Sequence, residues 1–154
     1  LINNPLGWIV SNINSNFALF KDNGVRYIRK VVLAVRPSSK DISKLINTTA
    51  TLCRFYNASF TLLHVFPEGS TKNNLKKIKN NSNLLLSKYD NTAKLRIEYS
   101  ENPTELVSKI TAEYDLLVLG TPKKETWKSM LFGTGEDKFA ANSSCSVLRL
   151  TINN

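Results

Sequence analysis

The sequence has few of the residues from which metal sites and phosphate-binding loops are built. It contains two cysteines, one histidine and six glycines in 154 residues. Cys53 and Cys145 lie far apart without metal-ligand spacing, and no secretory signal precedes them. Both are expected to be reduced, as in a cytoplasmic protein. Nothing in this pattern supports a metal centre or a P-loop.

Long apolar runs and catalytic constellations are missing as well. No apolar run approaches the roughly 20 residues that a membrane-spanning helix requires. The one histidine, His64, lies in an apolar run without an accompanying nucleophile or carboxylate, so a structural, hydrogen-bonded imidazole is expected. The two cysteines are expected to be small buried hydrophobes. The sequence therefore favours a protein that is not an enzyme.

Basic charge is abundant by contrast. The net charge is +9, and 42% of the residues are hydrophobic, which is typical of one soluble, globular domain of this length. Such a charge favours contact with phosphates, nucleic acid or an anionic membrane. No base-reading motif is present, so a nucleic-acid-binding module is only an alternative. Many lysines lie among asparagines and serines and are expected to form a solvated face: Lys72, Lys76, Lys77, Lys79 and Lys88.

Short apolar runs separated by helical patterns predict strands that alternate with helices. Strands are expected at 31–35, 60–66, 94–99, 115–120 and 145–150, and the polar alternation of 94–99 is typical of a strand near a sheet edge. Alternation of this kind predicts an α/β fold with a parallel sheet covered on both faces.

The helix signals differ in quality. Ser38 or Ser39 is expected to cap the first helix, with Asp41 in its first turn, and the helix should end at Asn57-Ala58. The second helix, around 75–89, has a weaker helical pattern in its asparagine-rich segment 80–83, so its bounds are left open. The third has the clearest start, Asn102-Pro103-x-Glu105, and its apolar positions run to Tyr114.

From residue 120 onward the sequence resembles universal stress protein domains. That family carries Gly-x2-Gly-x9-Gly-(Ser/Thr) after its fourth strand, and this chain reads Gly120-x2-Lys123-x9-Gly133-Thr134. The family's usual tail, GSVSEKVLRHAPCPVLVV, aligns without a gap on GTGEDKFAANSSCSVLRL, residues 133–150. The resemblance implies a three-layer α/β sandwich of the adenine nucleotide alpha hydrolase-like type, with a five-stranded parallel sheet in the order 3-2-1-4-5.

The resemblance also places a ligand site between strands one and four, where the strand order reverses. Glycines there would let backbone amides approach an anion, helped by a helix N-terminus. The candidate anion or nucleotide site consists of six residues: Gly120, Lys123, Gly133, Thr134, Gly135 and Arg36.

Several residues depart from what nucleotide binding needs. Nucleotide-binding members of the family have Asp-Gly after the first strand, and this chain has Arg36-Pro37. Lys123 replaces the second glycine, and Glu136 puts a negative charge near the expected phosphates. We therefore expect a degenerate site without a bound cofactor. ATP or another adenine nucleotide, and another small anion attracted by the nearby lysines, remain alternatives.

The beginning of the chain predicts a second unit. Leu6-Gly7 followed by 15–20 echoes Phe132-Gly133 followed by 144–149. We therefore expect residues 1–23 to be the last helix and strand of a preceding related domain, and residues 24–154 to be the universal stress protein-like domain. The remnant strand, 17–20, should then lie antiparallel beside 145–150, covering an open sheet edge.

These features lead to a functional hypothesis. We expect a non-enzymatic regulatory domain, part of a larger transporter of the amino acid permease or cation/proton antiporter type, in the cytoplasm at the inner face of the plasma membrane. Its partners would be the transporter domains of the same polypeptide, or a homodimer partner bound through the last strand. Alternatives are a soluble ATP-binding tandem universal stress protein and a nucleic-acid-binding module.

Overall fold

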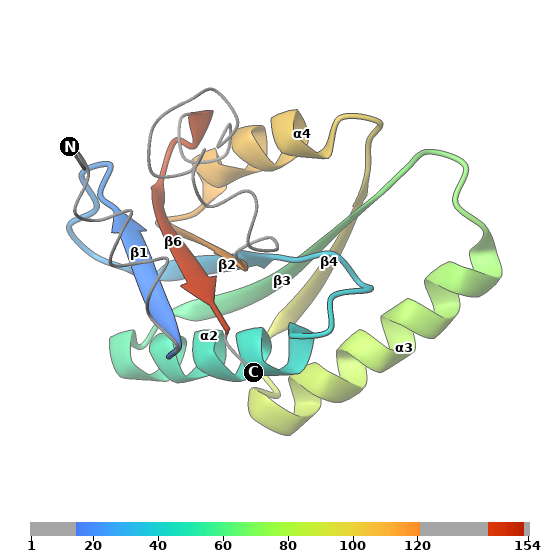
Figure 1. The fold of residues 1–154 in the computed structure, drawn as a ribbon, viewed down its shortest axis with the longest axis horizontal. Helices are drawn as coiled ribbons and strands as arrows, with labels where there is room; N and C mark the ends of the chain where they lie inside the picture. The colour runs from blue at the N-terminus through green and yellow to red at the C-terminus, as the bar shows by residue number, and fades with distance from the viewer. Residues whose placement is uncertain (1–14, 121–141, 153–154) are drawn as a thin grey trace, which may run out of the picture.

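A computed structural model describes residues 15–120 and 142–152. A mostly parallel sheet lies between α4 on one side and α2 and α3 on the other (Figure 1). The elements, in chain order, are β1 (Phe17–Lys21), β2 (Lys30–Ala34), α2 (Ile42–Tyr56), β3 (Ser59–Phe66), α3 (Lys72–Tyr89), β4 (Lys94–Tyr99), α4 (Pro103–Ile110), the 3-10 helix η1 (Thr111–Glu113), β5 (Leu116–Gly120) and β6 (Ser146–Thr151).

The order of the strands confirms the expected topology. The six-stranded sheet has the order β1-β6-β5-β2-β3-β4. Read from β4 to β6, it is the predicted 3-2-1-4-5 arrangement, and these five strands pair in parallel. β1 pairs antiparallel with β6, with Phe17 opposite Thr151 and Phe20 opposite Leu148. The strand expected beside the end of the chain is therefore where the sequence predicts it.

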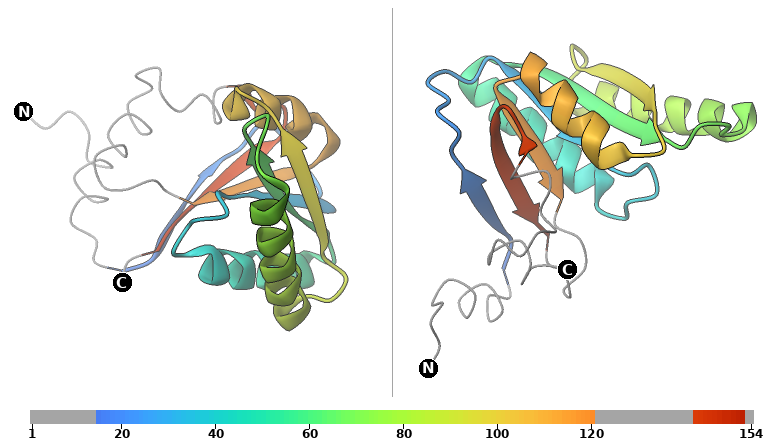
Figure 2. Two further views of the ribbon diagram at one scale, coloured as in Figure 1. Left: turned by 90° about the vertical axis from the view of Figure 1, so that its right-hand side faces the viewer. Right: turned by 90° about the horizontal axis from the view of Figure 1, so that it is seen from above.

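The core lies in two layers because both faces of the central strands are buried. One cluster joins α2 and α3 to the sheet and includes Leu45, Leu86 and Val118. The other lies under α4 and includes Val107 and Leu117. Successive residues of β5 alternate between the two clusters, as strand geometry requires. Figure 2 shows the helices on opposite sides of the twisted sheet.

The prediction for the start of the first helix is wrong. Ser38 and Ser39 do not cap α2: the N-cap is Asp41, which makes no side-chain cap hydrogen bond. The carbonyl oxygen of Arg36 accepts a hydrogen bond from Ser39 N at 2.9 Å, so this segment is a turn through Pro37. The helix can begin only after that turn. Its end is as expected, with Asn57 in the left-handed conformation at φ 53°.

The asparagine-rich segment does not interrupt the second helix. α3 runs unbroken over 18 residues. Ser82 is 2% exposed and is hydrogen-bonded to the His64 side chain, so a tertiary contact fixes the helix at this weak point. The lysines of α3 are exposed, as expected.

The third helix begins as predicted and ends earlier. Asn102 caps α4 by accepting a hydrogen bond from Glu105 N, and Pro103 is the first helical residue. The helix stops at Ile110 and η1 follows, so Tyr114 lies outside it in extended backbone. The chain must extend there because Asp115 N already donates to the carbonyl oxygen of Lys30 at the start of β5.

Candidate functional site

The carboxyl ends of β2 and β5 lie side by side at the point where the strand order reverses. Ala34 is opposite Leu119 in the parallel ladder, so the chain that continues through Arg36 leaves the sheet at the same edge as Gly120. This brings two of the predicted site residues to one edge of the sheet. Arg36 is exposed there and Gly120 is half-buried. Four predicted site residues lie outside the described residues: Lys123, Gly133, Thr134 and Gly135.

The backbone where β2 ends is already engaged in hydrogen bonds. Val35 N donates to the carbonyl oxygen of Leu63 at 3.2 Å, and the Val35 carbonyl oxygen accepts from His64 Nδ1 at 2.8 Å. The carbonyl oxygen of Arg36 closes the turn with Ser39, and Pro37 has no N–H to donate. A nucleotide would therefore find few backbone partners along this segment.

His64 connects three elements from inside the core. Its side chain is 0% exposed. Because a carbonyl can only accept, Nδ1 carries the hydrogen toward Val35, and Nε2 then accepts from the Ser82 hydroxyl at 2.8 Å. Burial lowers the pKa of His64, and the hydrogen bond to Val35 opposes this in part. The expectation of a structural, hydrogen-bonded histidine is confirmed.

Gly120 has a packing role that sequence reasoning did not find. A Cβ atom at this position would lie 3.0 Å from Leu45 Cδ1 of α2. The Leu45 side chain therefore packs closely over Gly120, which has no side chain to displace it. A larger residue at this position would require the Leu45 side chain to shift, whether or not an anion binds beside Gly120.

A buried cation lies at the same edge and was missed at the sequence level. Arg149 of β6 is only 9% exposed, and its Nη1 donates to the Gly120 carbonyl oxygen at 3.3 Å. The signal was present in the sequence, since Arg149 interrupts an otherwise uncharged last strand where the family's tail has valine. Arg149 brings positive charge to the edge that contains Arg36 and Gly120, and such charge favours an anion.

The two thiols lie in the core and are poor nucleophiles. Cys53 and Cys145 are 1% and 6% exposed. Burial, together with the nearby Asp90 carboxylate, raises the pKa of Cys53 to about 12, and burial raises that of Cys145 to about 11. Both remain protonated at neutral pH, which agrees with the expectation that they are packing residues.

Among residues 15–120 and 142–152, no cluster of metal-ligating side chains was found. In the same part of the chain, none of the helices combines the length and hydropathy that crossing a bilayer would need.

The fold and the strand order define an α/β protein with a topological switch point between β2 and β5. No protein-family model matches the sequence, and no curated protein matches it. Solved structures match it clearly. A universal stress protein in complex with cAMP has a TM-score of 0.62 at 17% identity, and the match covers 79% of this chain and 96% of that chain. The chain thus has the universal stress protein fold.

Two other solved chains match a larger share of this chain. A universal stress protein from Archaeoglobus fulgidus has a TM-score of 0.67 at 13% identity, and the match covers 95% of this chain and 53% of that one. A chain from Pseudomonas aeruginosa has a TM-score of 0.63 at 16% identity, with 98% of this chain and 60% of that chain covered. This chain therefore spans a little over half the length of these two neighbours.

Proposed function

We propose that this chain is a non-enzymatic regulatory domain whose adenine-nucleotide site has degenerated. One observation carries the proposal: the segment that leaves β2 at the switch point is Arg36-Pro37, with its neighbouring backbone groups already hydrogen-bonded within the protein. A solved neighbour is in complex with cAMP, so the fold can hold such a ligand. Here the positions that would contact adenosine offer a cation and a proline instead of a carboxylate and a flexible glycine.

We propose further that residues 1–23 are the end of a preceding related domain and that residues 24–154 form the regulatory domain. The antiparallel pairing of β1 with β6 supports this, because β1 adds a strand outside the predicted five-stranded sheet. The longer solved neighbours also support it, since their matches take in almost the whole of this chain.

The larger polypeptide is proposed to be a membrane transporter of the amino acid permease or cation/proton antiporter type. The domain would then lie on its cytoplasmic side, near the inner face of the membrane. The net charge of +9 supports such a position, because the anionic lipids of that face attract basic surfaces. A homodimer built directly on β6 would need β1 to be displaced, because β6 already pairs with β5 and β1.

A nucleotide titration tests the degenerate site. A fluorescent ATP analogue is expected to bind the wild-type chain with a Kd weaker than about 100 µM. The double substitution Arg36→Asp with Pro37→Gly restores the usual pair and is expected to strengthen binding at least about tenfold. Lys40→Asp, an equal change of charge in the same loop, is the matched control and should not. A sub-micromolar wild-type Kd that is abolished by Gly133→Val would show that the site is intact.

A second candidate ligand is a small anion without an adenosine part. The buried Arg149 beside Gly120 favours it, because a cation at this edge of the sheet would attract negative charge. Isothermal titration with inorganic phosphate and with pyrophosphate tests this candidate. Binding that is lost in Arg149→Met and retained in Lys40→Met would support it, and equal binding by both variants would contradict it.

A further inference from the structure

α3 carries charge of one sign only. Its 18 residues include no acid, and all of its charged side chains are exposed lysines: Lys72, Lys76, Lys77, Lys79 and Lys88. The nearest acids in the sequence, Glu68 and Asp90, lie outside the helix at its two ends. Among the described residues, none of these lysines makes an ion pair, whereas Lys109 of α4 lies 2.6 Å from Glu105. Within the described part of the chain, the charge of α3 is therefore open to an external anion.

The lysines lie on both sides of the face that α3 buries. That face contains the buried residues of the helix, Ser82 and Leu86. With about 3.6 residues per turn, Lys76 falls on one flank of this face, and Lys77 and Lys88 fall on the other. The solvent side of α3 is therefore bordered by positive charge along both of its margins.

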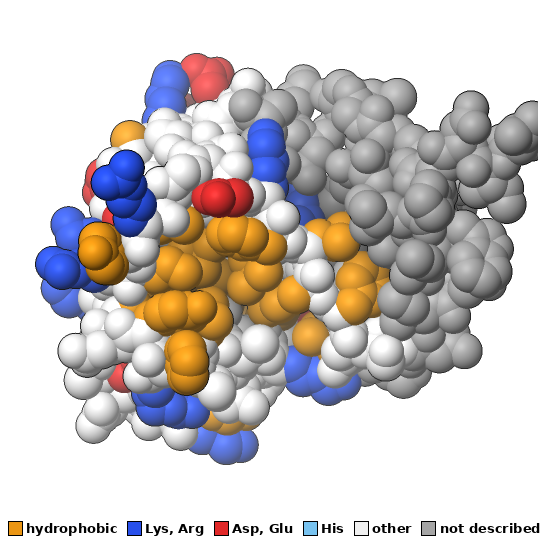
Figure 3. Space-filling model, turned by 90° about the vertical axis from the view of Figure 1, so that its left-hand side faces the viewer, with side chains coloured by type: hydrophobic (Ala, Val, Ile, Leu, Met, Phe, Trp, Pro, Cys, Tyr) orange, Lys and Arg blue, Asp and Glu red, His pale blue; other side chains and the backbone are white. Residues whose placement is uncertain are grey.

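α3 also stands out from the body of the domain. Figures 1 and 2 show it on the outside of the sheet, extending past β4. Hydrophobic side chains gather on the opposite side of the molecule (Figure 3), so the lysines of α3 form a separate surface. A helix that projects in this way can contact an extended surface along its solvent side.

The residue types on α3 favour lipid over nucleic acid as the anionic partner. Leu84 is 72% exposed and lies on the same stripe of the helix as Lys77 and Lys88, so an apolar side chain stands among the lysines. α3 contains no arginine to bind phosphate in a bidentate fashion, and its one aromatic residue, Tyr89, is half-buried and poorly placed to stack on bases. Flexible lysines suit mobile lipid head groups, and a leucine can enter the acyl boundary below them.

We propose that the solvent side of α3 binds the surface of a bilayer that contains anionic phospholipids. A cluster of about four to eight lysines or arginines on one helix is typical of segments that bind phosphatidylserine. α3 supplies five, with an exposed leucine between them. This inference rests on the membrane position proposed above and assigns that contact to one element of the fold.

Vesicle sedimentation tests the assignment. At about 0.1 M NaCl, the 154-residue chain is expected to bind phosphatidylcholine vesicles with about 30% phosphatidylserine at least about tenfold more strongly than vesicles of phosphatidylcholine alone. The combined substitutions Lys76→Gln, Lys77→Gln and Lys88→Gln should weaken this binding at least about tenfold. A wild-type chain that does not distinguish the two kinds of vesicle would overturn the proposal.

The matched control removes three exposed cations from other elements: Arg26→Gln, Arg29→Gln and Lys109→Gln. The two triple variants have the same net charge, so a difference between them reports where the charge lies. The control should weaken vesicle binding less than about threefold. Equal weakening by both variants would leave the membrane position standing and refute the role of α3. Circular dichroism shows whether each variant is folded, which is expected because glutamine and lysine have similar helix propensities.

Leu84→Gln separates a lipid surface from nucleic acid because it leaves the net charge unchanged. It is expected to weaken vesicle binding about threefold or more and to leave retention on duplex DNA as it is in the wild type. Unchanged vesicle binding by Leu84→Gln would overturn the proposal. So would tight binding of duplex DNA that the lysine variant loses, in a chain that ignores phosphatidylserine. The nucleotide titration is read separately, so loss of vesicle binding leaves the degenerate-site proposal intact.

Discussion

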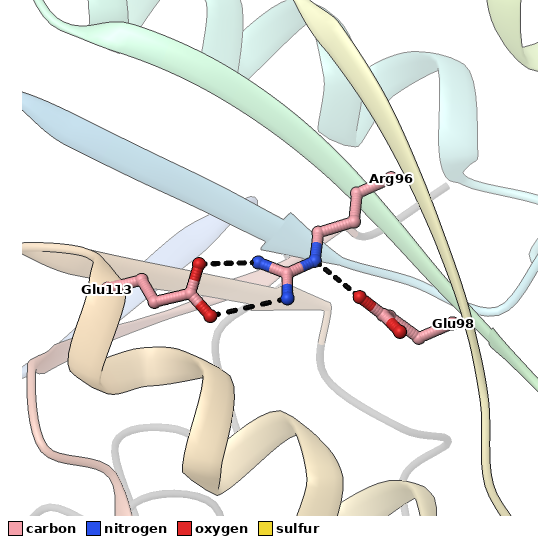
Figure 4. Close-up of polar contacts among 3 residues, drawn as sticks. All are labelled: Arg96, Glu98 and Glu113. Atoms are coloured by element: carbon pink, nitrogen blue, oxygen red, sulfur yellow. Dashed lines mark hydrogen bonds and ion pairs between the residues drawn. The ribbon is translucent and has the colours of Figure 1, made fainter.

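The two outer strands of the sheet, β4 and β1, differ in how they are protected against pairing with another strand. At β4, charged residues alternate along the strand, and Arg96 Nε lies 2.7 Å from Glu98 Oε1. The same guanidinium binds both oxygens of Glu113 in η1, at 2.8 and 3.3 Å (Figure 4). At β1, four uncharged residues precede a single lysine. The β4 edge is charged and bonded to its own domain, while the β1 edge is apolar and, within the described sheet, paired on one side only.

The two outer strands therefore stabilise the domain in different ways. The ion pairs of Arg96 are partly exposed, with side chains 29% and 58% accessible for Arg96 and Glu113, so their stabilisation is modest. Their larger effect is to discourage pairing of β4 with a foreign strand. β1 contributes in another way, because it covers the outer side of β6 by a five-residue antiparallel ladder. Changes at the two edges should therefore differ in size and in kind.

Removal of β1 is expected to have the largest effect. A chain that begins at Asp22 loses the ladder and uncovers Val147 and Leu150, and its free energy of unfolding should fall by about 2–4 kcal/mol. Urea denaturation measures the loss. Tyr99→Ala, at the half-exposed end of β4, is the control at the opposite edge and should cost less than about 1 kcal/mol. Equal losses in the two chains would mean that β1 does not stabilise the sheet.

Acidification is expected to have an intermediate effect on stability. The group that titrates is His64 of β3, the strand next to β4. The folded pKa of His64 lies below its ordinary value of about 6.5 because the ring is buried. The unfolded chain then binds a proton first as the pH falls, so stability is complete above pH 6.5 and is lost as the pH drops from there toward the folded pKa. Denaturation curves between pH 7.5 and 5 should show this loss, and His64→Gln should flatten it.

This titration is distinct from that of the β4 edge. Arg96 holds the pKa of Glu113 below its ordinary value, so the contribution of that ion pair is present above about pH 4.5 and is lost only as the pH falls further. His64 is the one histidine of the chain. A pH dependence near 6 that survives in His64→Gln would therefore contradict the assignment.

Substitution at the β4 edge is expected to have the smallest effect. Arg96→Met removes both ion pairs and should lower the Tm by no more than about 3 °C at low salt. The difference should shrink in 0.5 M NaCl, about the range in which exposed pairs are screened. Lys109→Met removes the more exposed pair with Glu105 on α4 and should change the Tm less. A salt-independent loss in Arg96→Met would indicate that packing of its stem matters more than charge.

Much of the fold could be predicted because its signals are local or periodic. Buried strands, the Asn102 cap and the alternation of strands with helices are visible in the sequence, and the resemblance supplied the strand order. Two expectations about the helices were wrong: one because of a tertiary contact and one because of a local turn. The asparagines of α3 predicted a weak segment, but the Ser82–His64 hydrogen bond holds the helix there. Ser39 closes a turn with Arg36 instead of capping α2.

The candidate site was less predictable than the fold. That Arg36 and Gly120 lie at the same edge of the sheet follows from the topology alone. The bond from Arg149 to Gly120 depends on how β5 and β6 pair, and the contact of Gly120 with Leu45 depends on the depth at which α2 packs. Neither is encoded in residue spacing. The predicted positions beyond 120 stay predictions, since they lie outside the described residues.

The imidazole of His64 has a mechanical consequence for any ligand at this edge. The imidazole ring connects Val35, directly after β2, to Ser82 in the middle of α3 through two hydrogen bonds of 2.8 Å each. A ligand that displaces the backbone at Val35 must either displace α3 as well or break a buried hydrogen bond of His64. Movement of the segment after β2 is thus coupled to movement of α3, the lysine-rich helix, through the His64 side chain alone among the hydrogen bonds described above.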